Sequence, residues 1–161
     1  MKPGYVRCDS LAEALQVAAR LAAKTVVLDV EPQIAHWETG QETLDHGVKR
    51  LLDDIAALPG VAVVCFATNA RRRPSFTPAS QKFQVFYFAS AEKPFRISRF
   101  KSFPTPGVLI GDQILTDGVL ARRLGYTFVH CMPAVAEAPR GPWLLNRSGQ
   151  LVRRLLFTEP G

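Results

Sequence analysis

The segment TVVLDVEPQ, residues 25–33, joins an unbroken apolar run to two carboxylates. Residues 25–28 are β-branched or apolar throughout, which is typical of a strand that is buried on both faces of a sheet. Asp29 comes at the end of this run, and Glu31 follows two residues later, in front of Pro32. Carboxylates are costly to bury without a partner, so the segment predicts a central strand that ends at a functional group.

Four more segments along the chain have the same apolar character. We predict strands at residues 61–67, 84–88, 107–111 and 126–132. Apolar residues that recur at helical spacing predict helices between them. These helices are expected at residues 10–23, opened by the capping box SLAE, at residues 40–58, stopped by Pro59-Gly60, at residues 115–125, ended by Gly125, and in the basic tail of residues 143–161, within NRSGQLVRRLLF.

Buried strands that alternate with helices indicate an open, doubly wound α/β fold with a mostly parallel sheet, a Rossmann-like sandwich of three layers. The chain of 161 residues fits a single domain over residues 1–161. The segments between the strands are too short to hold a second domain that caps the site. Functional groups in such sheets gather beyond the carboxyl ends of the strands.

Composition narrows the class of protein. The net charge of +6 favours an anionic partner, such as a phosphate, an anionic lipid or a nucleic acid, although a solvated basic surface gives the same balance. We expect no signal peptide, and the longest apolar run, residues 61–67, is far shorter than the roughly twenty residues of a membrane span. The three cysteines are widely spaced, so we expect reduced thiols and a cytoplasmic protein.

Polar residues that suit phosphoryl transfer follow four of the predicted strands. They are Asp29 and Glu31 after the first, Thr68 and Asn69 after the second, Lys93 after the third, and Asp112, Gln113, Thr116 and Asp117 after the fourth. A carboxylate can attack phosphorus, and two or three oxygens can hold Mg²⁺. A hydroxyl and an ammonium group can hold the phosphate oxygens while charge shifts in the transition state.

These motifs resemble those of the haloacid dehalogenase superfamily of phosphatases, and the chain is similar to its small capless members related to phosphatidylglycerophosphate phosphatase. VVLDVEPQIAHW, residues 26–37, aligns with the first motif of that group, usually written LDLDNTLVPW. CFATNA, AEKP and IGDQILTDG match the second, third and fourth motifs, and the last is the most specific. The resemblance runs almost from end to end and implies the same Rossmann-like fold without a cap domain.

The resemblance also implies roles for individual residues. Asp29 would be the nucleophile and a Mg²⁺ ligand, and Glu31 would stand at the acid–base position and give its backbone carbonyl to the metal. Thr68 and the backbone of Asn69 would hold the phosphoryl group, and Lys93 would neutralise charge between the phosphate and Asp29. Asp112 would complete the metal site, which Asp117 would support directly or by orienting Lys93.

The first motif departs from the family pattern Asp-x-Asp-x-Thr. Glu31 replaces the second aspartate, Gln33 replaces the threonine, and Pro32 removes one backbone N–H from the loop. A misplacement of about 1 Å in a general acid can cost on the order of a hundredfold in rate. Two readings stay open: a working Mg²⁺-dependent phosphatase with Glu31 as the acid, and a degenerate relative that binds a phosphorylated ligand or a partner protein.

The substrate hypothesis rests on the uncapped site and on the tail. An uncapped crevice can admit a bulky phosphorylated substrate, including a lipid headgroup such as that of phosphatidylglycerophosphate. In the tail, Leu151, Leu155 and Leu156 lie near Arg147, Arg153 and Arg154, which suits peripheral contact with an anionic membrane, although the helix could equally pack on the sheet. The arginines at positions 71–73, 153 and 154 lack interleaved aromatic residues, so nucleic-acid binding is not expected.

Overall fold

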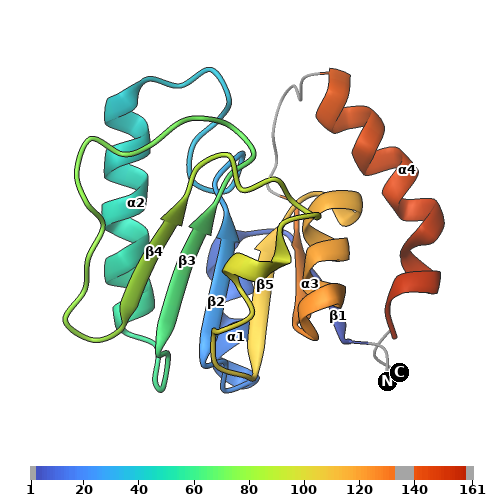
Figure 1. The fold of residues 1–161 in the computed structure, drawn as a ribbon, viewed down its shortest axis with the longest axis horizontal. Helices are drawn as coiled ribbons and strands as arrows, with labels where there is room; N and C mark the ends of the chain where they lie inside the picture. Colours follow the sequence, from blue (N-terminus) through green and yellow to red (C-terminus); the bar gives the residue numbers. More distant parts are fainter. Residues whose placement is uncertain (1–2, 133–139, 159–161) are drawn as a thin grey trace.

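A parallel β-sheet with helices on both faces forms the frame of the protein (Figure 1). The computed structural model describes residues 3–132 and 140–158. In chain order the elements are β1 (Tyr5–Cys8), α1 (Leu11–Arg20), β2 (Thr25–Asp29), α2 (Gln41–Ala56), β3 (Val63–Ala67), β4 (Gln84–Phe88), a short 3₁₀ turn η1 (Ile97–Arg99), β5 (Gly107–Gly111), a π-helical turn η2 (Ile114–Gly118), α3 (Val119–Leu124), β6 (Thr127–Cys131) and α4 (Arg140–Leu156).

The predicted α/β fold is confirmed. The six described strands pair in the order β1-β6-β5-β2-β3-β4, and every pairing is parallel. The five predicted strands lie within two residues of their observed bounds. The capping box is also observed, because the Glu13 backbone N–H donates to Ser10 Oγ and the Glu13 carboxylate accepts from the Asp9 backbone N–H.

Strand β1 was not predicted. It has four residues and, among the described strands, pairs with β6 alone, in the register Tyr5↔Phe128 to Cys8↔Cys131. It lies at an edge of the sheet, so one of its sides carries no neighbouring strand. A short run whose only partner lies more than a hundred residues away in the sequence leaves little local signal.

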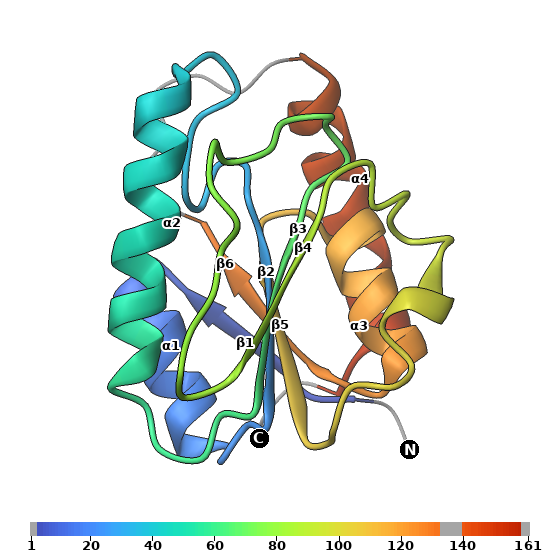
Figure 2. The same cartoon turned by 60° about the vertical axis from the view of Figure 1, so that its left-hand side comes forward.

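Two apolar layers cover the sheet (Figure 2). Helices α1 and α2 pack on one face against alternate strand residues such as Val26, Leu28 and Phe66. On the other face, which α3 and α4 cover, Val27 and Leu109 belong to a second apolar cluster. Because successive side chains of a strand point to opposite faces, a continuous apolar run such as TVVL supplies both layers at once.

The strand order places β2 at the point where the winding of the sheet reverses. The chain proceeds from β2 outward to β3 and β4, and then returns to the other side of β2 with β5 and β6. The loops that follow β2 and β5 therefore lead to opposite faces of the sheet, and the carboxyl ends of these two strands are where ligands bind in sheets of this class.

Helix α4 both packs on the sheet and carries exposed leucines. Gly149 is buried, and a Cβ there would lie 2.8 Å from Ile114 Cβ, while Phe157 just beyond the helix joins the core. Leu151 and Leu155 are 84% and 70% exposed on the outer side. The Arg147 side chain and residues 159–161 of the predicted tail lie outside what the structure describes. None of the described helices has the length and apolar character needed to span a bilayer.

Candidate active site

Three buried carboxylates meet at the carboxyl ends of β2 and β5. Asp29 is the last residue of β2, Asp112 directly follows β5, and Asp117 lies in the turn η2. One oxygen from each lies within 4.8 Å of the others, and each residue is at most 7% exposed. Carboxylates gathered this closely repel one another, so the site needs positive charge to be stable.

The turn after β5 brings Asp117 back over the strand it follows. The backbone N–H groups of Asp117 and Gly118 both donate to the Gln113 carbonyl, and the Asp117 carboxylate accepts from the Gln113 backbone N–H at 3.3 Å. Asp117 lies directly on Gly111, where an added Cβ would be 2.5 Å from Asp117 Oδ2. Only glycine leaves room for the carboxylate there, and π-helical turns of this kind are frequent at functional sites.

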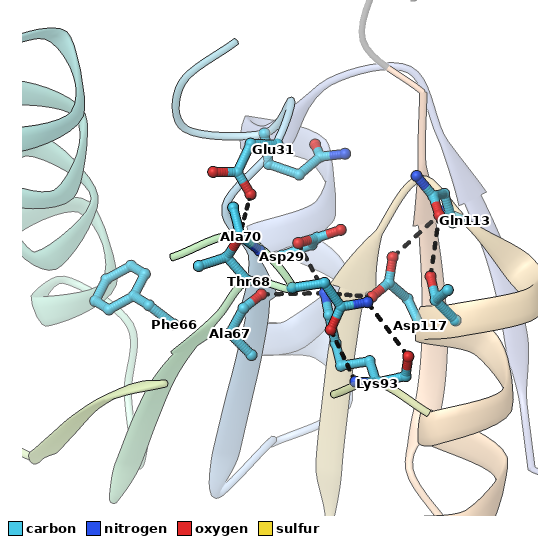
Figure 3. A network of polar contacts seen from close by, with 12 residues as sticks. Asp29, Glu31, Phe66, Ala67, Thr68, Ala70, Lys93, Gln113 and Asp117 are labelled. Atoms are coloured by element: carbon cyan, nitrogen blue, oxygen red, sulfur yellow. Dashed lines mark hydrogen bonds and ion pairs between the residues drawn. The ribbon is translucent and has the colours of Figure 1, made fainter. Parts of the chain in front are cut away.

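Lys93 supplies the positive charge (Figure 3). Its Nζ lies 2.7 Å from Asp29 Oδ1 and 2.7 Å from Asp117 Oδ1, and it donates to the Ala67 carbonyl at 3.0 Å. An ammonium group has three N–H donors, so these contacts use all of them. Lys93 therefore bridges two of the three carboxylates and the end of β3.

Asn69 holds Lys93 in place through its side chain. Asn69 Oδ1 accepts from the Lys93 backbone N–H at 2.8 Å, and Asn69 Nδ2 donates to the Lys93 carbonyl at 3.3 Å. The prediction assigned only the backbone of Asn69 to the site. Within the described parts of the chain, the Asn69 backbone N–H makes no hydrogen bond, so it remains a donor that a ligand could use.

Burial and neighbouring charges raise the pKa values of Asp29, Asp112 and Lys93. Burial, followed by the nearby Asp117, raises the pKa of Asp29 well above its usual range, and Lys93 opposes the shift. Burial and Asp117 likewise raise the pKa of Asp112 to about 7. Burial alone would lower the pKa of Lys93, but Asp117 and Asp29 outweigh it and the pKa is raised. A bound cation would favour the ionised carboxylates, and Asp112 Oδ1 is buried without a hydrogen-bond partner.

The Glu31 carboxylate is bonded to Thr68 rather than to Lys93. Its Oε2 accepts a hydrogen bond from the Thr68 hydroxyl at 2.5 Å, and its carboxylate is not one of the three that gather around Lys93. Figure 3 shows the Glu31 carboxylate beside Thr68, on the side of the site away from Asp117. The Glu31 side chain thus lies outside the predicted metal site, and the role predicted for its backbone carbonyl stays a prediction.

Arg72, in the loop after β3, faces the second oxygen of Glu31. Its Nη1 lies 4.0 Å from Glu31 Oε1, an atom that is buried and has no hydrogen-bond partner. The guanidinium group is fixed by donating to the backbone carbonyls of His36 at 2.7 Å and Thr39 at 2.8 Å. The sequence drew attention to the arginines at 71–73 but gave no sign that only the middle one turns inward.

A buried histidine forms a hydrogen bond with the backbone of Asp112. His130, in β6, bonds through Nε2 to the Asp112 carbonyl at 2.9 Å and through Nδ1 to the Tyr5 hydroxyl at 2.6 Å. Burial lowers the pKa of His130. Sequence reasoning missed this support, although a single histidine inside the apolar run YTFVHCM was a possible signal.

Gln33, which the resemblance predicts to stand in place of a threonine, forms no hydrogen bond with Glu31. Its Nε2 donates to the Cys131 carbonyl at 3.0 Å, which ties the loop after β2 to the end of β6. The structure therefore brings together Asp29, Lys93, Asp112 and Asp117 and places Asn69 against Lys93, while Glu31 is bonded to Thr68 and Gln33 to Cys131. Comparisons of the chain with protein-family models, with curated proteins and with solved structures gave no match.

Proposed function

We propose that this protein is a Mg²⁺-dependent phosphohydrolase of the haloacid dehalogenase type, in which Asp29 attacks phosphorus and becomes an aspartyl-phosphate. The observation that carries the proposal is the cluster of three buried carboxylates, two of them paired with Lys93, at the switch point of a parallel sheet. A purely structural ion pair would need one carboxylate for one lysine. Here two further acidic groups are buried in the same place, which is costly unless a cation binds there.

The donor set suits Mg²⁺. All three residues offer carboxylate oxygens, which hard cations prefer, and Mg²⁺ usually needs only one or two carboxylates besides water and substrate. Asp29 and Asp112 would hold the ion, with Asp117 and the Glu31 backbone carbonyl as further candidates. Bound Mg²⁺ would neutralise the charge of the phosphoryl group and polarise its oxygens. Asp112 Oδ1, which is buried without a partner, would gain one.

The residues of the chain would share the remaining work. The ionised oxygen of Asp29 would attack the phosphorus, and the leaving oxygen would depart on the opposite side with the electron pair. Lys93 would stabilise charge next to Asp29, and the Thr68 hydroxyl with the Asn69 backbone N–H would hold phosphoryl oxygens. Glu31 would protonate the leaving group and then take a proton from the attacking water.

One observation favours a second candidate function. The Thr68 hydroxyl donates to Glu31, so the acid–base residue and the phosphate donor are bound to each other. A site of this kind could bind a phosphorylated ligand with little or no turnover. Phosphatidylglycerophosphate, or a similar phosphorylated substrate, would suit either function, because no capping domain is present in the described part of the chain to exclude a bulky ligand.

The test is an assay of the purified protein with Mg²⁺, against p-nitrophenyl phosphate and against phosphatidylglycerophosphate. Asp29→Asn should lower turnover by at least about a thousandfold, because it removes the nucleophile and keeps the shape. Asp53→Asn, on the exposed side of α2, is the matched control and should turn over like the wild type. Turnover that survives Asp29→Asn would refute the mechanism, and Mg²⁺ binding without turnover would favour the second candidate.

We propose an anionic membrane surface as a binding partner of this protein. Leu151 and Leu155 are one helical turn apart on α4 and strongly exposed, and Arg154 between them is exposed too. An apolar strip beside basic groups suits the surface of anionic lipid. Sedimentation with anionic vesicles at low salt should bring down the wild type. A Leu151→Ser/Leu155→Ser variant should stay in solution, whereas the control Leu21→Ser, on another exposed leucine, should sediment.

A further inference from the structure

The geometry around Glu31 points to a protein whose aspartyl-phosphate forms faster than it is hydrolysed. We propose that the phosphoryl group accumulates on Asp29 when the donor is an acyl phosphate, whose leaving group needs no proton. The inference rests on the proposed function, since it takes Asp29 as the nucleophile. It goes further by naming the donor class and the slow step.

The first line of evidence is that both oxygens of Glu31 face protein groups. Oε2 accepts the Thr68 hydroxyl at 2.5 Å, and Oε1 faces the Arg72 guanidinium at 4.0 Å. Arg72 cannot easily move aside, because two backbone carbonyls of the 36–40 segment hold it. An acid or base acts only within hydrogen-bond reach of the proton that it transfers. Because Oε2 is bound to Thr68, Glu31 must give up this hydrogen bond before that oxygen can exchange a proton with a ligand.

The second line of evidence is a conflict at Thr68. Its oxygen accepts from the Ala70 backbone N–H at 2.9 Å, so its single O–H is the only proton that it can give. That proton goes to Glu31. When Thr68 donates to a phosphoryl oxygen it must release Glu31, and when it keeps Glu31 the phosphoryl group lacks this donor. A step that uses Thr68 on the phosphoryl group and Glu31 as a base must first break this buried hydrogen bond.

The two chemical steps differ in how much they need Glu31. In the first, an Asp29 oxygen forms a bond to phosphorus and the bond from phosphorus to the leaving oxygen breaks. An acyl phosphate releases a carboxylate anion that keeps the electron pair and requires no proton, whereas an alkyl phosphate releases an alkoxide that must be protonated. The first step can therefore proceed without an acid when the donor is an acyl phosphate.

The second step has no such alternative. Water forms the new bond to phosphorus, the bond between phosphorus and the Asp29 oxygen breaks, and Asp29 leaves as a carboxylate. The attacking water must lose a proton whichever donor supplied the phosphoryl group. Because Glu31 acts in this step only after its hydrogen bond to Thr68 is broken, this step becomes the slow one, and the phosphorylated protein persists.

The experiment follows the phosphoryl group directly. The full chain is incubated with Mg²⁺ and excess acetyl phosphate, and intact-protein mass spectrometry measures the fraction that carries one added phosphoryl group. The donor is then removed and the decay of that fraction is timed. We expect most of the wild type to be phosphorylated, no adduct on Asp29→Asn, and little adduct when glycerol phosphate replaces acetyl phosphate.

Two variants probe the cause of the slow step. Glu31→Asp withdraws the carboxylate from Thr68 and Arg72 by one methylene, and it should shorten the lifetime of the adduct by at least about tenfold while changing its formation rate far less. Arg72→Met should shorten the lifetime as well. The matched control Arg71→Met changes an exposed arginine of the same loop and should decay like the wild type.

The outcomes separate this inference from the proposed function. Steady release of phosphate without a detectable adduct would overturn the inference and leave the phosphohydrolase intact. If neither an adduct nor released phosphate is detected, the proposed function itself is overturned. A phosphoprotein that forms equally well from glycerol phosphate, or a folded Glu31→Asp with an unchanged lifetime, would show that Glu31 does not set the slow step. The donor comparison uses the wild type and so does not depend on any variant folding.

Discussion

Lys93 Nζ lies 2.7 Å from Asp29 Oδ1, and both side chains are almost completely buried. The lysine makes the same contact with Asp117. This arrangement ties the stability of the fold to the charge balance of the site, because removing the lysine would leave two buried carboxylates without their counter-ion.

Lys93→Met should lower the free energy of unfolding by about 3–5 kcal/mol, the typical cost of breaking a buried ion pair by deleting one partner. Urea denaturation followed by circular dichroism measures the loss, and added Mg²⁺ should restore part of it because binding stabilises the folded state. Lys101→Met, at an exposed position, is the control and should stay within about 0.5 kcal/mol of the wild type. A similar loss in both variants would contradict the role given to Lys93.

The raised pKa of Asp112 predicts how stability without metal depends on pH. The folded protein keeps the Asp112 proton up to a pKa of about 7, whereas the unfolded chain loses it near a pKa of about 4. Between these values the folded state binds more protons, so the contribution of Asp112 to the free energy of unfolding falls as pH rises. With EDTA present, the wild type minus Asp112→Asn difference should fall across this window and level off above it. A constant difference would show that Asp112 titrates normally.

The same shift predicts that Mg²⁺ binds more tightly as pH rises towards about 7, because the ion must displace the Asp112 proton. Isothermal titration calorimetry from pH 5.5 to 8 should show the affinity rising with pH and protons being released on binding. Asp112→Asn should bind weakly and should lack this part of the pH dependence. Affinity that is independent of pH in the wild type would count against Asp112 as a ligand.

Asn69→Ala should impair turnover more than Mg²⁺ binding. The variant frees the backbone of Lys93 from both of its hydrogen bonds to Asn69, and a shift of about 1 Å in a catalytic group can cost on the order of a hundredfold in kcat. Asn69→Asp keeps the acceptor for the Lys93 N–H and should lose less. Gln81→Ala, at an exposed amide, serves as the control. Equal losses in kcat for Asn69→Ala and Gln81→Ala would show that Asn69 does not position Lys93.

Tyr5→Phe and Tyr87→Phe should have opposite consequences, although each removes one hydroxyl group. Tyr5 bonds to the buried His130, so its loss leaves a ring nitrogen unpaired and should cost about 1–3 kcal/mol in thermal or urea unfolding. The Tyr87 hydroxyl is buried without a hydrogen-bond partner, so its removal should be neutral or stabilising. The His130 contact would be unimportant if the two variants had the same stability.

The central strands and the position of the site were predictable from the sequence for one physical reason. A strand that is buried on both faces must be apolar throughout, so β2, β3 and β5 stand out, and parallel strands deliver the residues that follow them to one edge. That rule alone predicts that Asp29, Thr68, Lys93 and Asp112 lie together at the carboxyl edge of the sheet. The edge strand β1 was not predicted, because its pairing depends on one neighbouring strand, β6, that is distant in the sequence.

The direction of the Glu31 side chain could not be predicted in the same way. It depends on Thr68 and Arg72, which come from another loop, and on the 36–40 segment that fixes Arg72. The resemblance of the first motif predicts an acid–base role for Glu31, and a motif carries no information about side-chain rotamers. Likewise the prediction gave Asn69 a role through its backbone, whereas its side chain is what holds the backbone of Lys93.

The pairing of β1 with β6 also sets the order in which the protein can be completed during synthesis. Strand β1 is synthesised before the other described strands, yet its partner residues 128–131 belong to the last of them. Asp29, Lys93 and Asp117 can come together before that point, whereas Tyr5 reaches His130, and through it the Asp112 carbonyl, only after β6 has been made. A nascent chain arrested before β6 would hold the acidic cluster without its support, and β1 would remain an unpaired edge exposed to other chains.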